Sequence, residues 1–292
     1  MKNSIPLKPV KKIGVCAPSA RFDIEKLNTG LHTLQDLGFE VQVPDEIFEK
    51  KRYLAGDDIL RANIINNFFS DADIDAIICA RGGFGAMRTL KYLNWNVIKQ
   101  NPKPFIGFSD ITALLLSIID RTGNLVIHGP NVVSIAGAGQ ETIESFYNSI
   151  TGVFKKISVA NGKVIKPGKC AGILKGGNIA VISHLLGTMF QPDFENAVLF
   201  LEDIGEPAYK IDRMLTQMKM AGMFEKILGV VTGSFEKCSN DEYIEEILFE
   251  MFEEYHIPVL SGLDSGHGKI NLSLCMGAGV KMDTAAMEIC WN

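Results

Sequence analysis

The 292-residue chain lacks any apolar run near the roughly 20 residues that a transmembrane helix needs, so we expect no membrane span. It also lacks a strong charge of either sign, because 29 Lys and Arg against 34 Asp and Glu give a formal net charge of -5. A nucleic-acid surface needs clustered cations, and this mild acidity argues against one. The apolar run Ile13–Ala17 is too short for a signal peptide and is followed by Pro18. We therefore expect a cytoplasmic protein.

Paired cysteines are also missing. The six cysteines are scattered without any C-x-x-C, mostly in apolar strand-like runs such as AIICA and MEICW. They are expected to be reduced core residues, so neither a disulfide framework nor a zinc site is predicted. The glycine-rich segment RGGFG matches neither the dinucleotide-binding pattern nor the P-loop, and no cofactor is expected.

Strand and helix patterns alternate along the first half of the chain. Strands are expected at KIGVCAPS, FEVQVP, AIICA and PFIGFS, and helices at Ile24–Leu37, Asp57–Phe69 and Ile111–Arg121. Gly38 follows the first helix at the typical position of a helix-ending glycine. This βαβα rhythm predicts a mostly parallel, Rossmann-like sheet with helices on both faces.

The rhythm changes after His128-Gly129-Pro130. Residues from Gly152 to Cys170 are rich in Lys, Gly and Val, which indicates a hinge followed by strand hairpins. Further strands are expected at AVLFLEDI and ILGVVTGSF, and further helices near Ile211–Ala221 and Tyr243–Tyr255. We expect two domains, residues 1–150 and 151–292, with the functional site between them because ligand sites favour such crevices.

Ser109 is the most distinctive candidate for chemistry. The segment FIGFSDITALL runs from an apolar strand into Gly107, then Ser109, then a helix. A serine at such a corner holds its hydroxyl at the carboxyl edge of the sheet, as in a nucleophile elbow, although the residues do not spell G-x-S-x-G. Ser109-Asp110 is equally a good helix N-cap, so the motif alone leaves both interpretations open.

The glycines of Arg81-Gly82-Gly83-Phe84-Gly85 follow a buried strand and permit unusual backbone angles. They suit a tight turn between strand and helix. The same backbone is also suited to supply one N–H of an oxyanion hole opposite a nucleophile.

Carboxylates and histidines in the second half are candidates for an acid–base pair. Glu202 and Asp203 end an apolar strand and Glu206 follows, and any of them is suited to orient an imidazole. His267 lies in the glycine-flanked turn DSGHG, where its ring can reach a cleft, and His128 in HGP is a competitor. His32 and His184 lie within helical patterns and are expected at surface or packing positions, and His256 is expected in a loop before Ile-Pro. No spacing typical of metal ligands is present.

Taken together, these segments resemble the LD-carboxypeptidase family of serine peptidases, which includes the microcin-resistance peptidases. The resemblance runs nearly end to end and rests on the order of GVCAPSA, RGGFG, FIGFSDITALL, HGP, GILKGGNIAVISHLLGT, LFLEDIGEPAYKIDRMLTQMKMAG, GVVTGSF and DSGHG. Two positions depart from the family pattern. Phe84 stands where the family usually has tyrosine, and Cys275 replaces a proline often found after the histidine.

The resemblance implies a catalytic triad of Ser109, Glu202 and His267, with oxyanion donors at the backbone N–H groups of Asp110 and Gly83. It also implies a Rossmann-like N-terminal domain that carries the nucleophile and a smaller, β-rich C-terminal domain that carries Glu202 and His267. The resemblance further implies a homodimer.

The implied activity is release of the terminal D-alanine from a murein tetrapeptide during cell-wall recycling. An alternative is hydrolysis of a microcin-type aminoacyl-nucleotide antibiotic, a branch with longer chains and an extended, often aromatic loop. Here the stretch Gly187–Ala197 is short and holds only Phe190 and Phe194, while Trp95 and Trp291 lie elsewhere. A second alternative is a non-catalytic two-domain protein that binds a small ligand.

Overall fold

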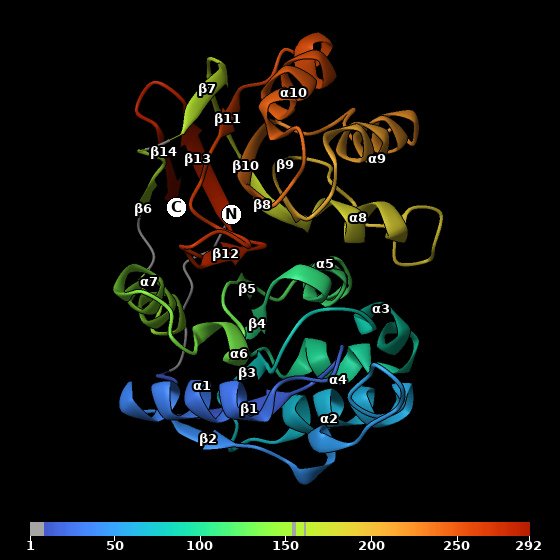
Figure 1. Cartoon of the computed structure of the whole chain (residues 1–292), viewed down its shortest axis with the longest axis vertical. Coiled ribbons are helices and arrows are strands. Elements are labelled where there is room, and N and C mark those ends of the chain that lie inside the picture. The colour runs from blue at the N-terminus through green and yellow to red at the C-terminus, as the bar shows by residue number, and fades with distance from the viewer. Residues whose placement is uncertain (1–8, 154–155, 161) are drawn as a thin grey trace. The chain divides into compact units, whose positions relative to one another are not determined.

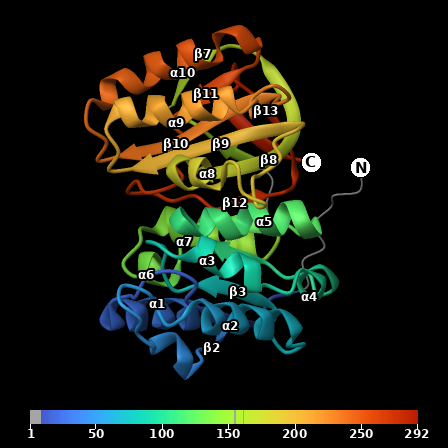
Figure 2. The ribbon, with the colours of Figure 1, turned by 90° about the vertical axis from the view of Figure 1, so that its right-hand side faces the viewer.

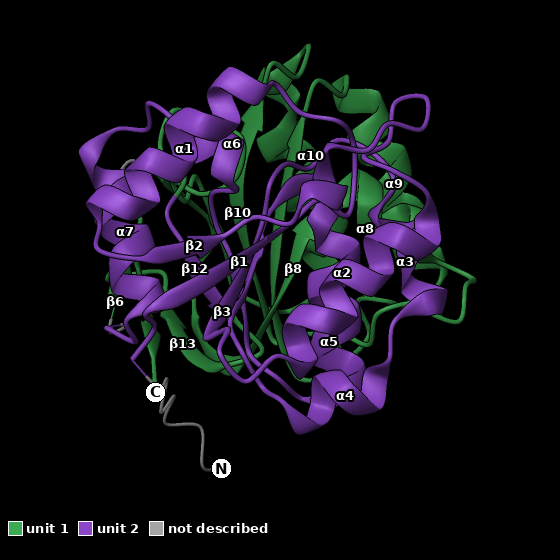
Figure 3. Ribbon diagram, turned by 90° about the horizontal axis from the view of Figure 1, so that it is seen from below, with its two compact units in different colours: residues 1–4, 154–271, 276–292 green, residues 5–153, 272–275 purple. Residues whose placement is uncertain are grey.

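The computed structural model describes residues 9–153, 156–160 and 162–292. These residues divide into two compact units, coloured separately in Figure 3. Unit 2 comprises the described chain up to Val153 together with the short segment Leu272–Cys275, and unit 1 comprises the rest. Within the described residues, no helix is both long enough and apolar enough to cross a bilayer.

Unit 2 is built on a six-stranded sheet with the order β12-β5-β4-β3-β1-β2. Neighbouring strands from β2 to β5 are all parallel. Short apolar runs form its central strands, and all four residues of β3 are buried, as expected for a strand covered on both faces. The strands are β1 (Lys12–Cys16), β2 (Glu40–Gln42), β3 (Ala76–Cys79), β4 (Phe105–Gly107), β5 (Val126–His128) and β12 (Leu274–Met276).

Helices cover both faces of this sheet, which confirms the predicted Rossmann-like arrangement. Figure 3 shows α1, α6 and α7 on one side and α2 to α5 on the other. Asp23 and Asp57 cap the first two long helices through their side chains, and Gly123 ends α5 in the left-handed conformation. The helices are α1 (Ile24–Asp36), α2 (Asp58–Ser70), α3 (Ala86–Thr89), α4 (Trp95–Gln100), α5 (Thr112–Thr122), α6 (Val132–Ile135) and α7 (Gln140–Ile150), with 3₁₀ turns η1 (Asp45–Phe48), η2 (Leu90–Tyr92) and η3 (Ser109–Ile111).

Unit 1 contains an eight-stranded mixed sheet with the order β6-β14-β13-β8-β9-β10-β11-β7 (Figure 1). The four strands from β8 to β11 are parallel, and the outer strands pair antiparallel. The strands are β6 (Lys156–Ser158), β7 (Lys163–Lys166), β8 (Lys169–Asn178), β9 (Ala197–Ile204), β10 (Gly229–Glu236), β11 (Val259–Ser261), β13 (Gly279–Asp283) and β14 (Glu288–Trp291). The predicted β-rich second domain is therefore confirmed.

Three helices of unit 1 lie side by side over its sheet in Figure 2. Their apolar stripes face the strands, as with Ile211, Leu215 and Met218 of α9, which are all buried. The helices are α8 (Ile179–Leu185), α9 (Ala208–Met220) and α10 (Ile244–Phe252), with 3₁₀ turns η4 (Asp241–Tyr243) and η5 (Glu253–Tyr255).

The strand hairpins predicted between Gly152 and Cys170 are wrong. β6 and β7 exist as strands, but β6 pairs with β14 and β7 pairs with β11, at opposite edges of the sheet. Their partners come from much later in the chain, so local composition could not reveal the pairing. The segment Leu272–Cys275 is likewise grouped with unit 2, where β12 forms the edge beside β5.

Candidate active site

Ser109 occupies a sharp turn between β4 and α5 in unit 2. Its backbone φ is +64°, a left-handed conformation that costs a residue with a Cβ roughly 1–3 kcal/mol. Phe108 before it is extended, and η3 begins at Ser109 itself. The serine is partly exposed although the residues on either side of it are buried. This is the geometry of a nucleophile elbow, in which backbone strain holds the hydroxyl clear of the sheet edge.

The glycine loop after β3 lies directly against Ser109. A Cβ on Gly82 would be 3.0 Å from Ser109 Cβ and 3.3 Å from its Oγ, so a larger residue at position 82 would crowd the serine side chain. Gly83 follows with φ of +107° and is exposed. Within the described ranges, the N–H groups of Gly83 and Asp110 donate no hydrogen bond. They are backbone donors of the kind that an oxyanion hole requires.

The side chain of Asp110 ties together the loops around Ser109. It accepts a hydrogen bond of 2.6 Å from Ser19 Oγ, in the loop after β1, and one of 2.8 Å from the N–H of Ala86, at the start of α3. Burial raises the pKa of the Asp110 carboxyl, and these two hydrogen bonds oppose the rise. The carboxylate therefore fixes the turn at Ser109 relative to the two neighbouring loops.

A buried arginine makes a second set of such ties. Arg61 of α2 is fully buried and donates through Nη1 to the carbonyl of Pro18, after β1, and to the carbonyl of Gly85, 3.0 Å away. Its Nη2 pairs with Asp58 at 2.5 Å, and Asp58 also binds Arg88. Arg61 is thus the common support of the loops that lie beside Ser109.

Unit 1 pairs Glu202 with His267. Glu202 Oε2 lies 2.6 Å from His267 Nδ1; the carboxylate is completely buried, and the imidazole is 13% exposed. When Nδ1 carries the proton and donates it to the carboxylate, Nε2 is left as an acceptor. A buried acid with a partly exposed imidazole is the arrangement that orients a general base.

The close approach of this loop to β9 depends on glycine. Gly266 has φ of +112°, and a Cβ there would be 2.7 Å from Glu202 Oε2. The N–H of Gly266 donates to Asn271 Oδ1 at 3.0 Å, and the N–H of Gly268 donates to Ser234 Oγ at 2.9 Å. These bonds hold the backbone on both sides of His267 in place.

The other acids near Glu202 have different partners. Asp203 accepts hydrogen bonds of 2.9 Å from Asn178 Nδ2 and from the N–H of Ala180, at the start of α8. Burial raises the pKa of Asp203 to about 6. Glu206 forms an ion pair of 3.2 Å with Lys210. Of the three acids that the residues alone left open, the structure brings Glu202 to His267.

The competing histidine, His128, is fully buried in β5, with its ring 6.2 Å from that of Phe108. His32, His184 and His256 are exposed, as expected. The candidate residues therefore form two groups, one in each unit: Ser109 with Gly83 and Asp110, and Glu202 with His267. Residue patterns did not single out Ser19, Arg61, Ser234 or Asn271. A signal was present for Arg61, because it shares a helix face with the buried Ile64, Ile65 and Phe68.

Comparison with known proteins finds two family models that match successive parts of the chain. The family model described as LD-carboxypeptidase N-terminal domain matches residues 13–129, and the model described as LD-carboxypeptidase C-terminal domain matches residues 171–282. The murein tetrapeptide carboxypeptidase of Pseudomonas aeruginosa is 30% identical over 277 residues, covering 89% of this chain and 89% of that protein.

Two further comparisons cover almost the whole chain. The microcin C7 self-immunity protein MccF of Escherichia coli is 27% identical over 316 residues, covering 95% of this chain and 92% of that protein. The crystal structure of muramoyltetrapeptide carboxypeptidase from Oxalobacter formigenes superposes with a TM-score of 0.85 at 27% identity, covering 96% of this chain and 98% of that one.

Proposed function

Because the chain belongs to the LD-carboxypeptidase family, we propose that it is a cytoplasmic serine carboxypeptidase that releases the terminal D-alanine of a murein tetrapeptide. The observation that carries the proposal is the 2.6 Å bond between the buried Glu202 and His267, which suits the imidazole to act as a base. The strained turn at Ser109 supports its role as the nucleophile. Ser109, Glu202 and His267 form the proposed triad.

The proposed reaction is acyl transfer to Ser109. Its Oγ attacks the carbonyl carbon of the last peptide bond while His267 Nε2 takes the hydroxyl proton. Glu202 holds the Nδ1 proton and stabilises the imidazolium. The N–H groups of Gly83 and Asp110 receive the oxyanion, an interaction worth roughly 3–4 kcal/mol per donor.

Two further stages complete the reaction. His267 returns its proton to the amine of D-alanine as the peptide C–N bond breaks, which leaves an ester on Ser109. A water molecule, deprotonated by His267, attacks that ester, and His267 returns the proton to Ser109 Oγ as the ester bond breaks and the tripeptide leaves. No redox agent or cofactor is required by this sequence of steps.

The direct test is the substitution Ser109→Ala, assayed by mass spectrometry of murein tetrapeptides and the D-alanine released from them. We expect turnover to fall by at least about 10³-fold, because the residual rate then rests on binding and oxyanion stabilisation alone. An unchanged melting temperature serves as the control for folding. Turnover that persists in the variant would contradict the assignment of the nucleophile.

The similarity to the microcin self-immunity protein supports a second candidate, hydrolysis of an aminoacyl-nucleotide. The stretch Gly187–Ala197 offers little for stacking a base, because Phe194 is buried, Phe190 is half-buried and the exposed large apolar side chain is that of Met189. We therefore rank this activity second. Incubation with an aminoacyl sulfamoyl adenosine and with a tetrapeptide, compared by kcat/KM, separates the two activities.

We further propose a homodimer, which light scattering of the purified protein tests.

A further inference from the structure

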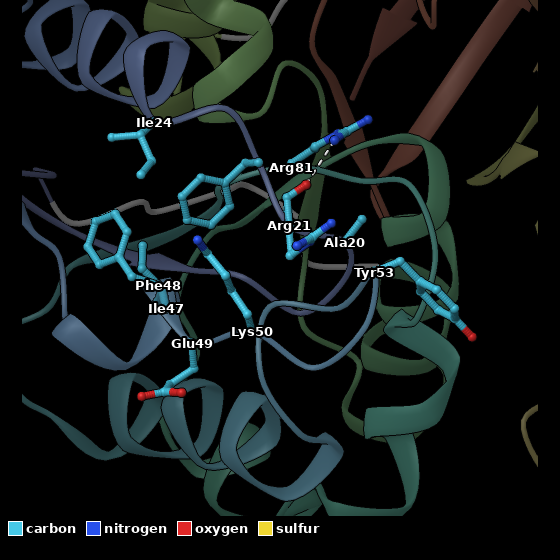
Figure 4. Close-up of a pocket in the computed structure, with 10 residues that line it drawn as sticks. Ala20, Arg21, Ile24, Ile47, Phe48, Glu49, Lys50, Tyr53 and Arg81 are labelled. Carbon is cyan, nitrogen blue, oxygen red and sulfur yellow. Dashed lines mark hydrogen bonds between the residues drawn. The ribbon is translucent and has the colours of Figure 1, made fainter.

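A cavity of about 490 Å³ lies wholly within unit 2, and the residues that line it are drawn in Figure 4. Its walls come from the loop after β1, the segment around η1, and Arg81 after β3. Its volume falls within the roughly 300–1,000 Å³ range typical of small-ligand sites. A single leaving residue such as alanine would fill only a small part of it.

The sheet topology places this cavity where α/β folds bind ligands. From β2 to β5 the strand order is 2-1-3-4-5, so the chain reverses direction between β1 and β3. The crevice at the carboxyl ends of such a strand pair is the usual ligand site of doubly wound sheets. Ala20 and Arg81, which follow β1 and β3, both line the cavity.

The cavity wall is continuous with the backbone beside the proposed nucleophile. Arg81 directly precedes Gly82, whose carbonyl accepts a hydrogen bond of 3.4 Å from the N–H of Ala20. A Cβ on Gly83 would be 2.8 Å from Ala20 Cβ. If a peptide binds with its carbonyl at Gly83, the residues on one side of that peptide bond therefore lie next to the cavity.

The charges of the cavity favour an anion, although the chain as a whole is acidic. Arg21, Lys50 and Arg81 line it, and within the described part of the chain none of them forms an ion pair with a carboxylate. Arg81 Nη1 donates to the carbonyl of Arg21 at 2.8 Å, the dashed bond in Figure 4, and this orients its guanidinium. The only acid in the lining is Glu49, and Figure 4 shows it extending in the opposite direction from Lys50.

Apolar side chains and the phenol ring of Tyr53 form the rest of the lining. Phe22 and Phe48 meet edge to face with their centroids 5.8 Å apart, and Ile47 is buried. The cavity is therefore suited to a ligand that has both aliphatic groups and free carboxylates, which are the groups that cationic side chains bind through charge-assisted hydrogen bonds.

We infer that this cavity binds the acyl side of the peptide substrate through a free carboxylate held by Arg21 and Lys50. The inference rests on the proposed function and adds to it the part of the substrate that is recognised. A murein stem peptide carries such a group upstream of the cleaved bond, on a D-glutamate linked through its γ-carboxyl. The cavity would then discriminate against stem peptides in which that α-carboxylate is amidated.

The test compares two tetrapeptides that differ only in whether this carboxylate is free or is a carboxamide. We expect wild-type kcat/KM to be about tenfold higher for the free acid, the size of one charge-assisted hydrogen bond. Arg21→Ala and Lys50→Ala should each bring the ratio towards one. Lys51→Ala removes a neighbouring exposed cation that does not line the cavity and should leave the ratio unchanged.

The outcomes separate this inference from the proposed function. Equal kcat/KM for the two peptides in the wild type, or an undiminished preference in the Arg21→Ala/Lys50→Ala double variant, would overturn the inference while carboxypeptidase activity stands. If the wild type cleaves neither peptide, the proposed function fails. Calorimetry with the two corresponding tripeptides then tests the inference. The inference predicts that the free acid binds more tightly than the carboxamide and that Lys50→Ala abolishes this difference. AMP is also tested as a competitor of these peptides. Competition by AMP in the wild type that is lost in Lys50→Ala would overturn the carboxylate assignment.

Discussion

Replacement of Glu202 by glutamine tests how the proposed base works. The substitution keeps the shape of a fully buried side chain and removes its charge. If the amide NH₂ takes the place of Oε2, it faces His267 Nδ1 as a donor, and the ring proton must move to Nε2. If the amide oxygen takes that place, a neutral group faces the imidazolium that forms in the reaction. In both cases Nε2 becomes a poorer base towards Ser109.

The expected loss is large because the bond is short and its carboxylate is completely buried. Changing the orienting acid of a serine peptidase triad to its amide lowers kcat by about 10⁴-fold, which is about 5 kcal/mol of transition-state stabilisation. Stability should change far less. Oε1 of Glu202 has no hydrogen-bond partner among the described residues, so removing the buried charge offsets part of the weaker hydrogen bond.

The assay pairs kcat/KM for D-alanine release with the free energy of unfolding in urea. Glu206→Gln is the matched control, since Glu206 pairs with Lys210 instead of a histidine, and it should keep full activity. If Glu202→Gln retained more than about a tenth of wild-type activity, His267 would not depend on this carboxylate and the reasoning would be refuted.

Two further predictions concern packing and pH. Gly82→Ala should lower kcat about 10²-fold, because the new Cβ would lie 3.0 Å from Ser109 Cβ. The fold should be kept, because the backbone of Gly82 lies outside the left-handed region. An unchanged kcat for D-alanine release would contradict this prediction. Burial raises the pKa of Asp203 to about 6 in the folded state, so ionisation of this carboxyl opposes folding. The free energy of unfolding of the wild type, relative to that of Asp203→Asn, should therefore fall by up to about 3 kcal/mol as pH rises from about 4 to 6. Urea unfolding of both proteins across that range checks the slope, and a difference that is flat or rises with pH would count against it.

Strands β1 to β5 of the first domain were predictable because each is a local signal, whereas the edge strand β12 comes from the distant segment Leu274–Met276. The buried strand at Ala76–Cys79 is a continuous apolar run, and α1 and α2 begin at aspartate caps that the sequence displays. The pairing of β6 with β14 was not predictable, because the two strands are separated by well over a hundred residues. Register between such distant segments depends on packing that no short window contains.

The site was partly predictable for a related reason. Glu202 and Asp203 are adjacent in β9, and successive residues of a strand point to opposite faces, so only one of them can meet His267. The residues alone do not say which face the loop with His267 covers. Likewise, the support that Arg61 gives to Pro18 and Gly85 joins three segments that only the folded chain brings together.

Covalent labelling by a fluorophosphonate, located by peptide mass spectrometry, tests the central claim most directly, since only a serine activated by a base reacts quickly. We predict a single modified residue, Ser109, with labelling slowed by at least about 10²-fold in His267→Ala. Absence of label on Ser109 in a folded wild-type protein, or labelling at the same rate in His267→Ala, would contradict the proposed serine peptidase.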